Sequence, residues 1–597
     1  MYAQAVRIPP RLRHRGGRRI LSSASEQCAK GCAFPDVQLD CIKYLKLGDP
    51  ACGSGNFLTE TYLSIRKLEN EVIMELTGGQ IMMGELYDPI QVTIGQFYGI
   101  EINDFAVTVA KTALWIAESQ MMKATEEILH RELDFLPLKT NANIVEGNAL
   151  RLDWESVVPK SSLSYIMGNP PFVGSQYMSK QQKSDIMTLF KGNKKAGVLD
   201  FVSGWYIKAA DMMQNSALKT AFVSTNSITQ GEQVPALWKQ LIESYHVHID
   251  FAHKTFRWDS EASIKAHVHC VIIGFSIAPN HSPKTIYSSE RRQEVEVINP
   301  YLMDAPIAFI ESRKKPLSSV PPITKGCQPT DGGNLIIEDS ELSDFLSKEP
   351  RAERFIKRLV GAREFINNKK RWCLWLVNAS PSELRKMPYV MERIEKVREM
   401  RLKSSDAGTR RLAETPTVFR ETYNPDSFII VPSASSERRR YIPLGFLGGE
   451  TISTNLNLII PDATIYHFGI LTSNVHMAWM RTVCGRLKSD YRYSKDIVYN
   501  NFPWPTPTDA QRAEIEKTAQ EILDARAKYP DSSLADLYDD LTMPPELRRA
   551  HQRNDKAVMR AYGFHKKGAD GKAHWLSESE CVAELMKMYQ ELAMGKK

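Results

Sequence analysis

Long apolar runs are missing from this sequence of 597 residues. A transmembrane helix needs about 18 or more successive apolar residues, and no segment reaches that length. The first 25 residues contain six arginines and no acid, and they lack the apolar core of a signal peptide. We therefore expect a cytoplasmic protein without a membrane span.

Cysteine is also scarce, with nine residues spread over the whole chain. This number excludes the disulfide framework of small secreted domains. Cys28, Cys32 and Cys41 lie near His14, but no CxxC pair is present and the spacing fits no common zinc pattern. Unpaired thiols are therefore expected here rather than a zinc site.

Histidines gather in one stretch of the chain, where a metal site is conceivable. Alternation along a strand places His267 and His269 on one face without any metal. We therefore expect no metal ion in this stretch. The five residues are His246, His248, His253, His267 and His269.

Acidic residues are under-represented in one part of the chain. The net charge is +7, and residues 351–500 contain 26 Lys and Arg against 15 Asp and Glu. The local excess of 11 is larger than that of the whole chain, so the remainder is slightly acidic. Such a local excess is typical of a module that binds a polyanion, although a solvated charged surface would account for part of it. Cations alternate with aromatic residues at 369–372, 438–441 and 488–493, which suits contacts to DNA phosphates and grooves.

Internal repeats and long low-complexity tracts are absent. Apolar segments instead alternate between strand and helix periodicity, which predicts an α/β fold with a doubly wound, Rossmann-like sheet. Neighbouring strand candidates at 246–251 and 266–275 predict an antiparallel hairpin at the edge of this sheet. The other expected strands begin at Leu45 and cover 96–102, 143–146, 163–167 and 220–225, and the expected helices begin near Phe57 and cover 106–117 and 201–213.

Breaker residues divide the chain into four predicted parts. Residues 1–45 are rich in Arg and show no regular period, so we expect a disordered or remnant segment. The α/β domain covers 46–290. A basic, mixed α/β domain, expected to bind a polyanion, follows at 291–505, and a helical C-terminal domain covers 506–597.

A glycine-rich turn connects the first predicted strand to its helix, in the segment Asp49-Pro-Ala-Cys-Gly-Ser-Gly-Asn-Phe-Leu58. Gly53 and Gly55 allow a ligand to approach the backbone closely. Leu58 occupies the place of the third glycine of a nicotinamide-binding motif, and no Lys-Ser/Thr pair of a P-loop is present. The turn therefore does not predict a dinucleotide or a phosphate as ligand.

Two acids near this turn favour a different ligand. Asp49 precedes the glycines and suits a cationic amino group, which S-adenosyl-L-methionine carries on its methionine end. Glu101 ends the next predicted strand, where an acid can accept hydrogen bonds from ribose hydroxyls. A plain tight turn is the alternative interpretation.

A second turn, Asn169-Pro-Pro-Phe172, follows another predicted strand. As a simple loop, it would do no more than end that strand. As a catalytic turn, it offers the Asn169 side-chain carbonyl and the Pro170 backbone carbonyl to the two hydrogens of a planar amine. Pro170 and Pro171 stiffen the turn, and Phe172 offers a flat face for stacking. Such an amine within duplex DNA is reached only when its base is flipped out.

These motifs and their order resemble those of amino-methylating DNA methyltransferases in which the recognition domain follows the catalytic one. Further segments resemble, more narrowly, the Mme-like fused restriction-modification family, over about residues 46–597. The segments that carry the resemblance are 49–58, 99–103, 147–150, 168–172, 223–229, 256–258, 484–494 and 501–505.

The resemblance implies a methyltransferase that methylates N6 of adenine at a specific site in double-stranded DNA, as part of a restriction-modification system. It implies S-adenosyl-L-methionine as cofactor. The implied catalytic residues are Asn169, Pro170, Pro171 and Phe172, and the implied cofactor-binding residues are Asp49, Ala51, Gly53, Gly55, Glu101 and Asn148.

Two features depart from the family pattern. Many relatives have Asp in place of Asn148, whose side-chain oxygen can still accept from the adenine amine of the cofactor. The family's nuclease domain and helical connector have no counterpart in residues 1–45, so we expect a remodelled member that does not cleave DNA. A non-catalytic DNA-binding remnant, and a methyltransferase acting on RNA or protein glutamine, remain alternatives. Phe256 and Trp258 would help to orient the flipped base, or serve in ordinary core packing.

Overall fold

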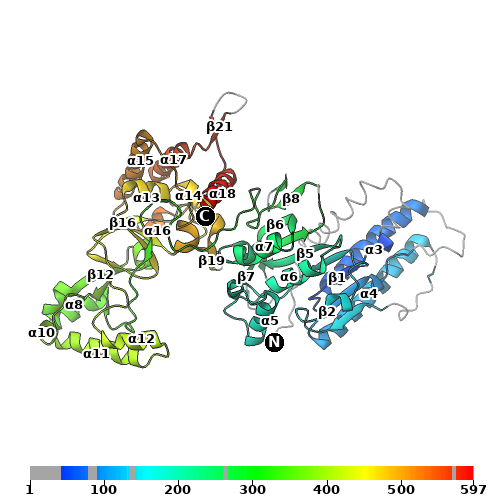
Figure 1. Ribbon diagram of the computed structural model, residues 1–597, viewed down its shortest axis with the longest axis horizontal. Helices are drawn as coiled ribbons and strands as arrows, with labels where there is room; N and C mark the ends of the chain where they lie inside the picture. The colour runs from blue at the N-terminus through cyan, green and yellow to red at the C-terminus, as the bar shows by residue number, and fades with distance from the viewer. Residues whose placement is uncertain are drawn as a thin grey trace. The chain divides into compact units, whose positions relative to one another are not determined.

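The computed structural model describes residues 42–77, 90–130, 132–133, 141–259, 267–280, 282–289, 291–487, 489–567 and 573–595. The cysteines and histidine considered for zinc, and nearly all of the basic segment 1–45, lie outside these ranges. The chain divides into two compact units, Met1–Phe309 and Ile310–Lys597. Figure 1 shows both units, with labels on many of their helices and strands.

A nine-stranded sheet forms the centre of the first unit, in the order β3-β2-β1-β4-β5-β7-β6-β8-β9. Neighbours pair in parallel from β3 to β5, and β7 then pairs with β5 in the antiparallel sense. The predicted α/β fold with a mostly parallel, doubly wound sheet is confirmed. The strands are β1 (Leu47–Asp49), β2 (Phe97–Glu101), β3 (Asn143–Glu146), β4 (Tyr165–Gly168), β5 (Lys219–Thr225), β6 (His248–Asp259), β7 (His267–Ser276), β8 (Lys284–Tyr287) and β9 (Arg292–Val295).

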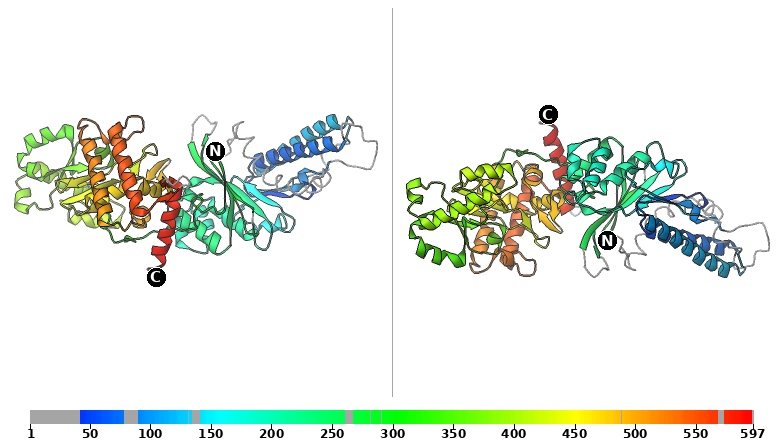
Figure 2. Two further views of the ribbon diagram at one scale, coloured as in Figure 1. Left: turned by 90° about the horizontal axis from the view of Figure 1, so that it is seen from above. Right: turned by 90° about the horizontal axis from the view of Figure 1, so that it is seen from below.

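Helices cover both faces of this sheet. Leu58 and Tyr62 of α3 and Leu114 of α4 share a core with Leu47 and Phe97 of the sheet, and Figure 2 shows α3 and α4 side by side in both views. Aromatic residues of α6 and α7 pack on the opposite face, against β5 and β7. The helices are α3 (Asn56–Thr77), α4 (Asp104–Leu129), α5 (Lys180–Leu189), α6 (Ser203–Met212) and α7 (Gln233–Glu243).

The far edge of the sheet differs from the sequence prediction. The expected antiparallel pair is present as β6 and β7, but β8 pairs in parallel with β6, and β9 follows β8. The pair is therefore internal rather than at the edge. The strands β8 and β9 have four residues each and β9 is polar, which leaves little periodicity to detect.

Among the described residues, the second unit contains two four-stranded sheets, one three-stranded sheet and one two-stranded sheet. The sheet β11-β13-β12-β17 packs on α8, α10 and α11 around one apolar core. The strands are β10 (Thr324–Lys325), β11 (Ile336–Glu338), β12 (Ile356–Val360), β13 (Arg371–Leu374), β14 (Ser427–Pro432), β15 (Ala434–Ser435), β16 (Gly445–Gly448), β17 (Thr451–Ser453), β18 (Asn457–Pro461), β19 (Gly485–Leu487), β20 (Asp490–Arg492), β21 (His565–Lys567) and β22 (Ala573–Trp575).

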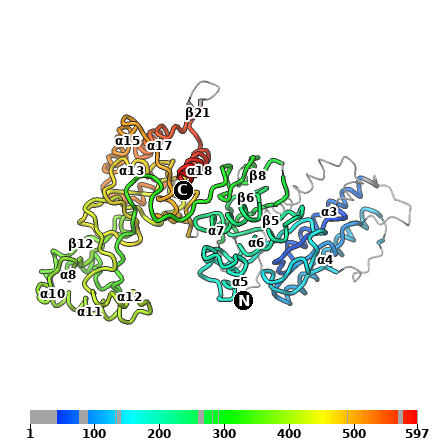
Figure 3. Tube along the Cα trace, viewed as in Figure 1, coloured from blue at the N-terminus to red at the C-terminus, as the bar shows by residue number. Residues whose placement is uncertain are grey.

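Helices, including those at the end of the chain, complete the second unit. Figure 3 shows α15 and α17 side by side. The helices are α8 (Asp339–Lys348), α9 (Ala362–Ile366), α10 (Pro381–Leu384), α11 (Pro388–Leu402), α12 (Ala407–Arg411), α13 (Ile465–Leu471), α14 (Asn474–Val483), α15 (Asp509–Ala527), α16 (Leu534–Leu537), α17 (Pro545–Tyr562) and α18 (Glu578–Met594).

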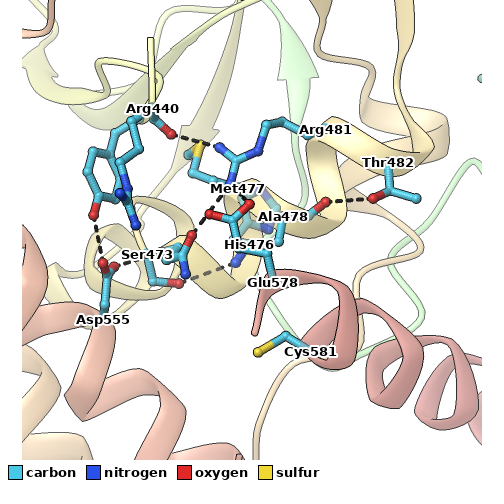
Figure 4. Close-up of polar contacts among 12 residues, drawn as sticks. Arg440, Ser473, His476, Met477, Ala478, Arg481, Thr482, Asp555, Glu578 and Cys581 are labelled. Carbon is cyan, nitrogen blue, oxygen red and sulfur yellow. Dashed lines mark hydrogen bonds and ion pairs between the residues drawn. The ribbon is translucent and has the colours of Figure 1, made fainter. Parts of the chain in front are cut away.

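Polar contacts connect these C-terminal helices to the preceding part of the unit (Figure 4). Asp555 of α17 accepts hydrogen bonds from the Tyr441 hydroxyl at 2.6 Å and from the Asn474 backbone N–H at 2.7 Å. Arg481 of α14 forms an ion pair of 2.8 Å with Glu578 of α18. The C-terminal helices therefore belong to the same packed body as α14.

Six cysteines within the described residues are free and buried: Cys52, Cys270, Cys327, Cys373, Cys484 and Cys581. Over the same residues, no helix combines the length and the apolar character that a membrane crossing requires.

Candidate active site

The two turns singled out in the sequence meet at the carboxyl ends of β1 and β4. These strands are parallel neighbours, with Leu47 beside Tyr165 and Gly48 beside Ile166. A Cβ atom on Gly168 would lie 2.4 Å from Oδ1 of Asp49, so the Asp49 carboxyl lies directly against the end of β4. Carboxyl ends of parallel strands are where ligands of doubly wound sheets bind.

Asp49 is a buried acid with few polar partners. Its side chain is 2% exposed, and Oδ1 accepts a hydrogen bond of 2.9 Å from the Ala51 backbone N–H. Burial raises the pKa of the carboxyl from 3.8 to about 7; the Ala51 hydrogen bond opposes this shift, and the charge of Glu101 adds to it. A cation placed here would stabilise the charged form of Asp49.

The glycine-rich turn has the backbone conformation that its sequence predicts. Gly53 and Gly55 have φ values of 54° and 79°, which favour glycine. A Cβ atom on Gly55 would lie 2.9 Å from Cβ of Ala110, because α4 packs closely there. Among the described residues, by contrast, no atom lies within 4 Å of the Cβ position of Gly53. The turn is therefore closed toward α4 and open at Gly53.

Glu101 braces this turn from the end of β2. Its Oε2 accepts the Gly53 N–H at 2.9 Å, and its Oε1 accepts the Asn103 N–H at 3.0 Å. Each oxygen keeps a second lone pair, which can accept from a ligand hydroxyl. Ile102 follows directly and is 68% exposed. Ile102 was not among the predicted site residues, although an apolar residue directly after a strand-ending acid can be recognised in the sequence.

Asn148 lies at the same edge, two residues after β3. Its Oδ1 accepts the Leu150 N–H at 3.0 Å, and its Nδ2 donates to Oδ2 of Asp185 at 3.2 Å. Asp185 also forms an ion pair of 2.8 Å with Arg151. An acid from α5 therefore contacts Asn148 at this edge.

The Asn-Pro-Pro-Phe turn begins where β4 ends. Pro170 is buried, Pro171 is exposed and Phe172 is half-buried. The Asn169 Oδ1 atom is buried and has no hydrogen-bond partner among the described residues. A buried acceptor without a partner costs free energy, on the order of 1–3 kcal/mol, and such atoms are rare in folded proteins. Asn169 therefore presents an acceptor that lacks its donor.

Asp200 holds the far end of this turn. It is buried, and its Oδ1 accepts the Val173 N–H at 3.1 Å while its Oδ2 accepts the Thr225 hydroxyl at 3.1 Å. Burial raises the pKa of Asp200, although these hydrogen bonds act in the opposite direction. The Val173 carbonyl accepts the Phe201 N–H at 3.0 Å. The chain after Phe172 is therefore fixed by contacts that no local sequence signal predicted.

Phe256 and Trp258 lie in β6, with ring centroids 6.1 Å apart. Phe256 pairs in register with Cys270, which pairs with Thr225 at the carboxyl end of β5. Both aromatic side chains are half-buried, and among the described residues the Trp258 Nε1 donor has no partner. Both residues therefore lie toward the same edge of the sheet as Asn169, where the parallel strands have their carboxyl ends.

The histidines of the same region make separate contacts. His248 contacts the Ser276 hydroxyl at 2.9 Å, and the His253 ring stacks on Tyr287. Over the described part of the chain, no group of three His, Cys, Asp or Glu side chains could hold a metal ion.

Sequence models of three domains of one family match successive parts of the chain. Residues 37–288 match the MmeI DNA-methyltransferase domain, residues 304–506 match the MmeI target recognition domain, and residues 507–595 match the MmeI C-terminal domain.

Two relatives match nearly the whole chain. DNA methyltransferase A of Bacillus subtilis is 42% identical over 556 residues, which are 92% of this chain and 62% of that protein. The structure of the Type IIL restriction-modification enzyme MmeI in complex with DNA is 44% identical, with a TM-score of 0.82, over 93% of this chain and 74% of that chain. The chain thus spans less than two thirds of the Bacillus relative. From these matches, the chain belongs to the MmeI family.

Proposed function

We propose that this chain is a site-specific, adenine-specific DNA methyltransferase of a restriction-modification system. In this proposal it transfers a methyl group from S-adenosyl-L-methionine to N6 of an adenine flipped out of duplex DNA. The observation that carries the proposal is the buried Oδ1 atom of Asn169, which finds no partner in the described part of the chain and lies at the strand end that touches Asp49. Family membership and the description of the MmeI relative as a DNA complex support it.

Asn169 and Pro170 would orient the target amine. The Asn169 side-chain oxygen and the Pro170 carbonyl accept its two hydrogens, which directs the nitrogen lone pair away from the turn. Phe172, half-buried beside the prolines, stacks on the flipped ring. Because Asp200 and Phe201 fix the chain at Val173, this geometry is set before the base arrives.

The residues at the ends of β1, β2 and β3 fit S-adenosyl-L-methionine. Asp49 suits its amino group, the Glu101 oxygens suit ribose hydroxyls, and Ile102 suits one face of its adenine. Ala51, Gly53 and Gly55 line the turn, which is open at Gly53. When bound, the cofactor supplies an electrophilic methyl group.

The second unit would select the DNA sequence. Residues 304–506 match a target recognition domain, and residues 351–500 carry the local excess of positive charge. Cations near phosphates provide affinity, while groove contacts provide specificity.

The test is methylation of random-sequence duplex DNA with tritiated S-adenosyl-L-methionine, followed by nucleoside analysis. Label in N6-methyladenine supports the proposal, and sequencing of modified adenines then identifies the site. DNA retention without label would support a binding remnant instead. Label that appears only with RNA or protein as substrate would contradict the proposed substrate.

Binding of S-adenosyl-L-methionine should weaken at acid pH. The pKa of Asp49 is about 7, so the carboxyl is neutral below that pH and attracts the cofactor amino group only above it. We expect the dissociation constant to rise roughly tenfold between pH 7.5 and pH 6, measured by calorimetry. Asp49→Asn should bind weakly at both values. A wild-type affinity that does not change with pH would contradict this role.

Cofactor affinity should survive the substitutions Asn148→Asp and Asp185→Asn only when both are made together. Asn148→Asp places a second carboxylate where the amide now donates to Asp185, so cofactor affinity should fall about tenfold. Adding Asp185→Asn restores one acid and one amide, and the affinity should return to within about threefold of wild type. Calorimetry of the two single variants and the double variant checks this. Additive losses in the double variant would exclude the coupling.

A further inference from the structure

Tyr177 is the most exposed aromatic side chain among the described residues, at 86%. It belongs to the loop that follows Asn169-Pro-Pro-Phe172. An aromatic ring stabilises a fold by burial, and this one is almost entirely in solvent. Its ring is therefore available to a ligand.

The backbone around Tyr177 is held on both sides. The Tyr177 N–H donates to the Gly174 carbonyl at 2.8 Å, which closes a turn. Met178 is 8% exposed and anchors the next position in the core. Ser179 then caps α5 by accepting the Gln182 N–H at 3.1 Å. The exposed ring is therefore presented by a fixed turn and a helix start.

The same contacts keep Tyr177 close to the candidate active site. Val173 is fixed by Asp200 and Phe201, as described above. Gly174 is two residues from Phe172, and a hydrogen-bonded turn keeps its first and last Cα atoms within about 7 Å. With an extended reach of about 3.6 Å per residue, Tyr177 lies within about 14 Å of Phe172.

Positive charge follows this loop in the sequence. Asp185 is the single acid between positions 173 and 199, and it is paired with Arg151. The five lysines of this segment are exposed, which makes it attractive to phosphates. They are Lys180, Lys183, Lys191, Lys194 and Lys195.

We infer that Tyr177 enters the DNA duplex beside the target adenine and stacks on the bases that remain when the adenine turns out. This inference rests on the proposed function. Flipping leaves a gap in the base stack, and an inserted side chain that fills the gap lowers the free energy of the flipped state. Aromatic rings stack well on any base, so the contact needs no particular sequence. The lysines of the segment meet the phosphates on either side.

The test compares two DNA duplexes that contain the methylation site, once sequencing of modified adenines has identified it. One is fully paired, and the other has an abasic site opposite the target adenine, which removes its base pair. Tyr177→Ala should slow single-turnover methylation of the paired duplex by about 10- to 100-fold, but that of the abasic duplex by threefold at most. Tyr177→Phe keeps the ring and should stay within twofold of wild type on both.

Tyr44→Ala is the matched control, because Tyr44 is 70% exposed and lies at the amino end of β1, away from the site. It should match wild type. The inference would be overturned if Tyr177→Ala slowed methylation of both duplexes equally, or of neither. If neither rate changed, a protein partner would be left to explain the exposed ring. A wild-type chain that methylates neither duplex would refute the proposed function, and the inference with it.

Discussion

Asn169→Ala is expected to lower DNA methylation at least about a thousandfold, while DNA retention stays within about twofold of wild type. The variant removes the buried Oδ1 acceptor that has no partner among the described residues. Loss of one preorganised hydrogen-bonding group at a reacting centre typically costs 10²- to 10³-fold, and misplacement of the amine adds to that. Single-turnover rates with tritiated S-adenosyl-L-methionine give the first quantity, and filter retention of labelled duplex gives the second.

Asn169→Asp provides the internal control for this experiment. It keeps an acceptor oxygen at the same place, so it should retain more activity than Asn169→Ala. Cofactor affinity should be unchanged in both variants, because the side chain faces the substrate in the proposed geometry. Undiminished turnover in Asn169→Ala would mean that the turn serves only to end β4.

Arg401→Met is expected to lower the free energy of unfolding by about 3–5 kcal/mol, because several buried carbonyls lose their donor at once. Arg401 is 0% exposed and lies at the end of α11. Its guanidinium donates to the carbonyl oxygens of Pro329, Thr330, Leu412, Thr415 and Val418, at 2.8 to 3.3 Å. Methionine fills similar volume but donates to none of them, so buried carbonyls lose their partner.

Arg398→Met is the matched control on the same helix. Arg398 is exposed and forms a surface ion pair of 3.8 Å with Glu395, which contributes little to stability. In denaturant unfolding, the midpoint of Arg398→Met should therefore be close to that of wild type, and the midpoint of Arg401→Met should be much lower. Equal midpoints for the two variants would show that the carbonyl oxygens find other donors.

The centre of the first unit was predictable from the sequence because its signals are local. The strand before Gly53, the turn itself and the helix from Asn56 are one continuous segment, and the structure has them in that order. The edge was not predictable, because β8 and β9 are four residues long and pair through contacts made only in the folded sheet.

The candidate site likewise contains residues that local sequence signals predict and residues that they do not. Asp49 and Glu101 end β1 and β2, and Asn169 directly follows β4. Such strand ends can be located from hydrophobic patterns. Asp185 and Asp200 contact Asn148 and Val173 across 37 and 27 positions of the chain. Nothing in the neighbouring residues indicates such partners, because they depend on where α5 and α6 pack.

The contacts of Asp555 and Glu578 bear on how members of this family could exchange specificity by recombination. A crossover near position 505 would separate Asp555 and Glu578 from Tyr441 and Arg481 of the same chain, and burial already raises the pKa of Asp555 to about 6. A crossover near position 309 would transfer Tyr441, Arg481 and both acids together. Hybrid proteins joined near position 505 should therefore misfold more often than hybrid proteins joined near position 309.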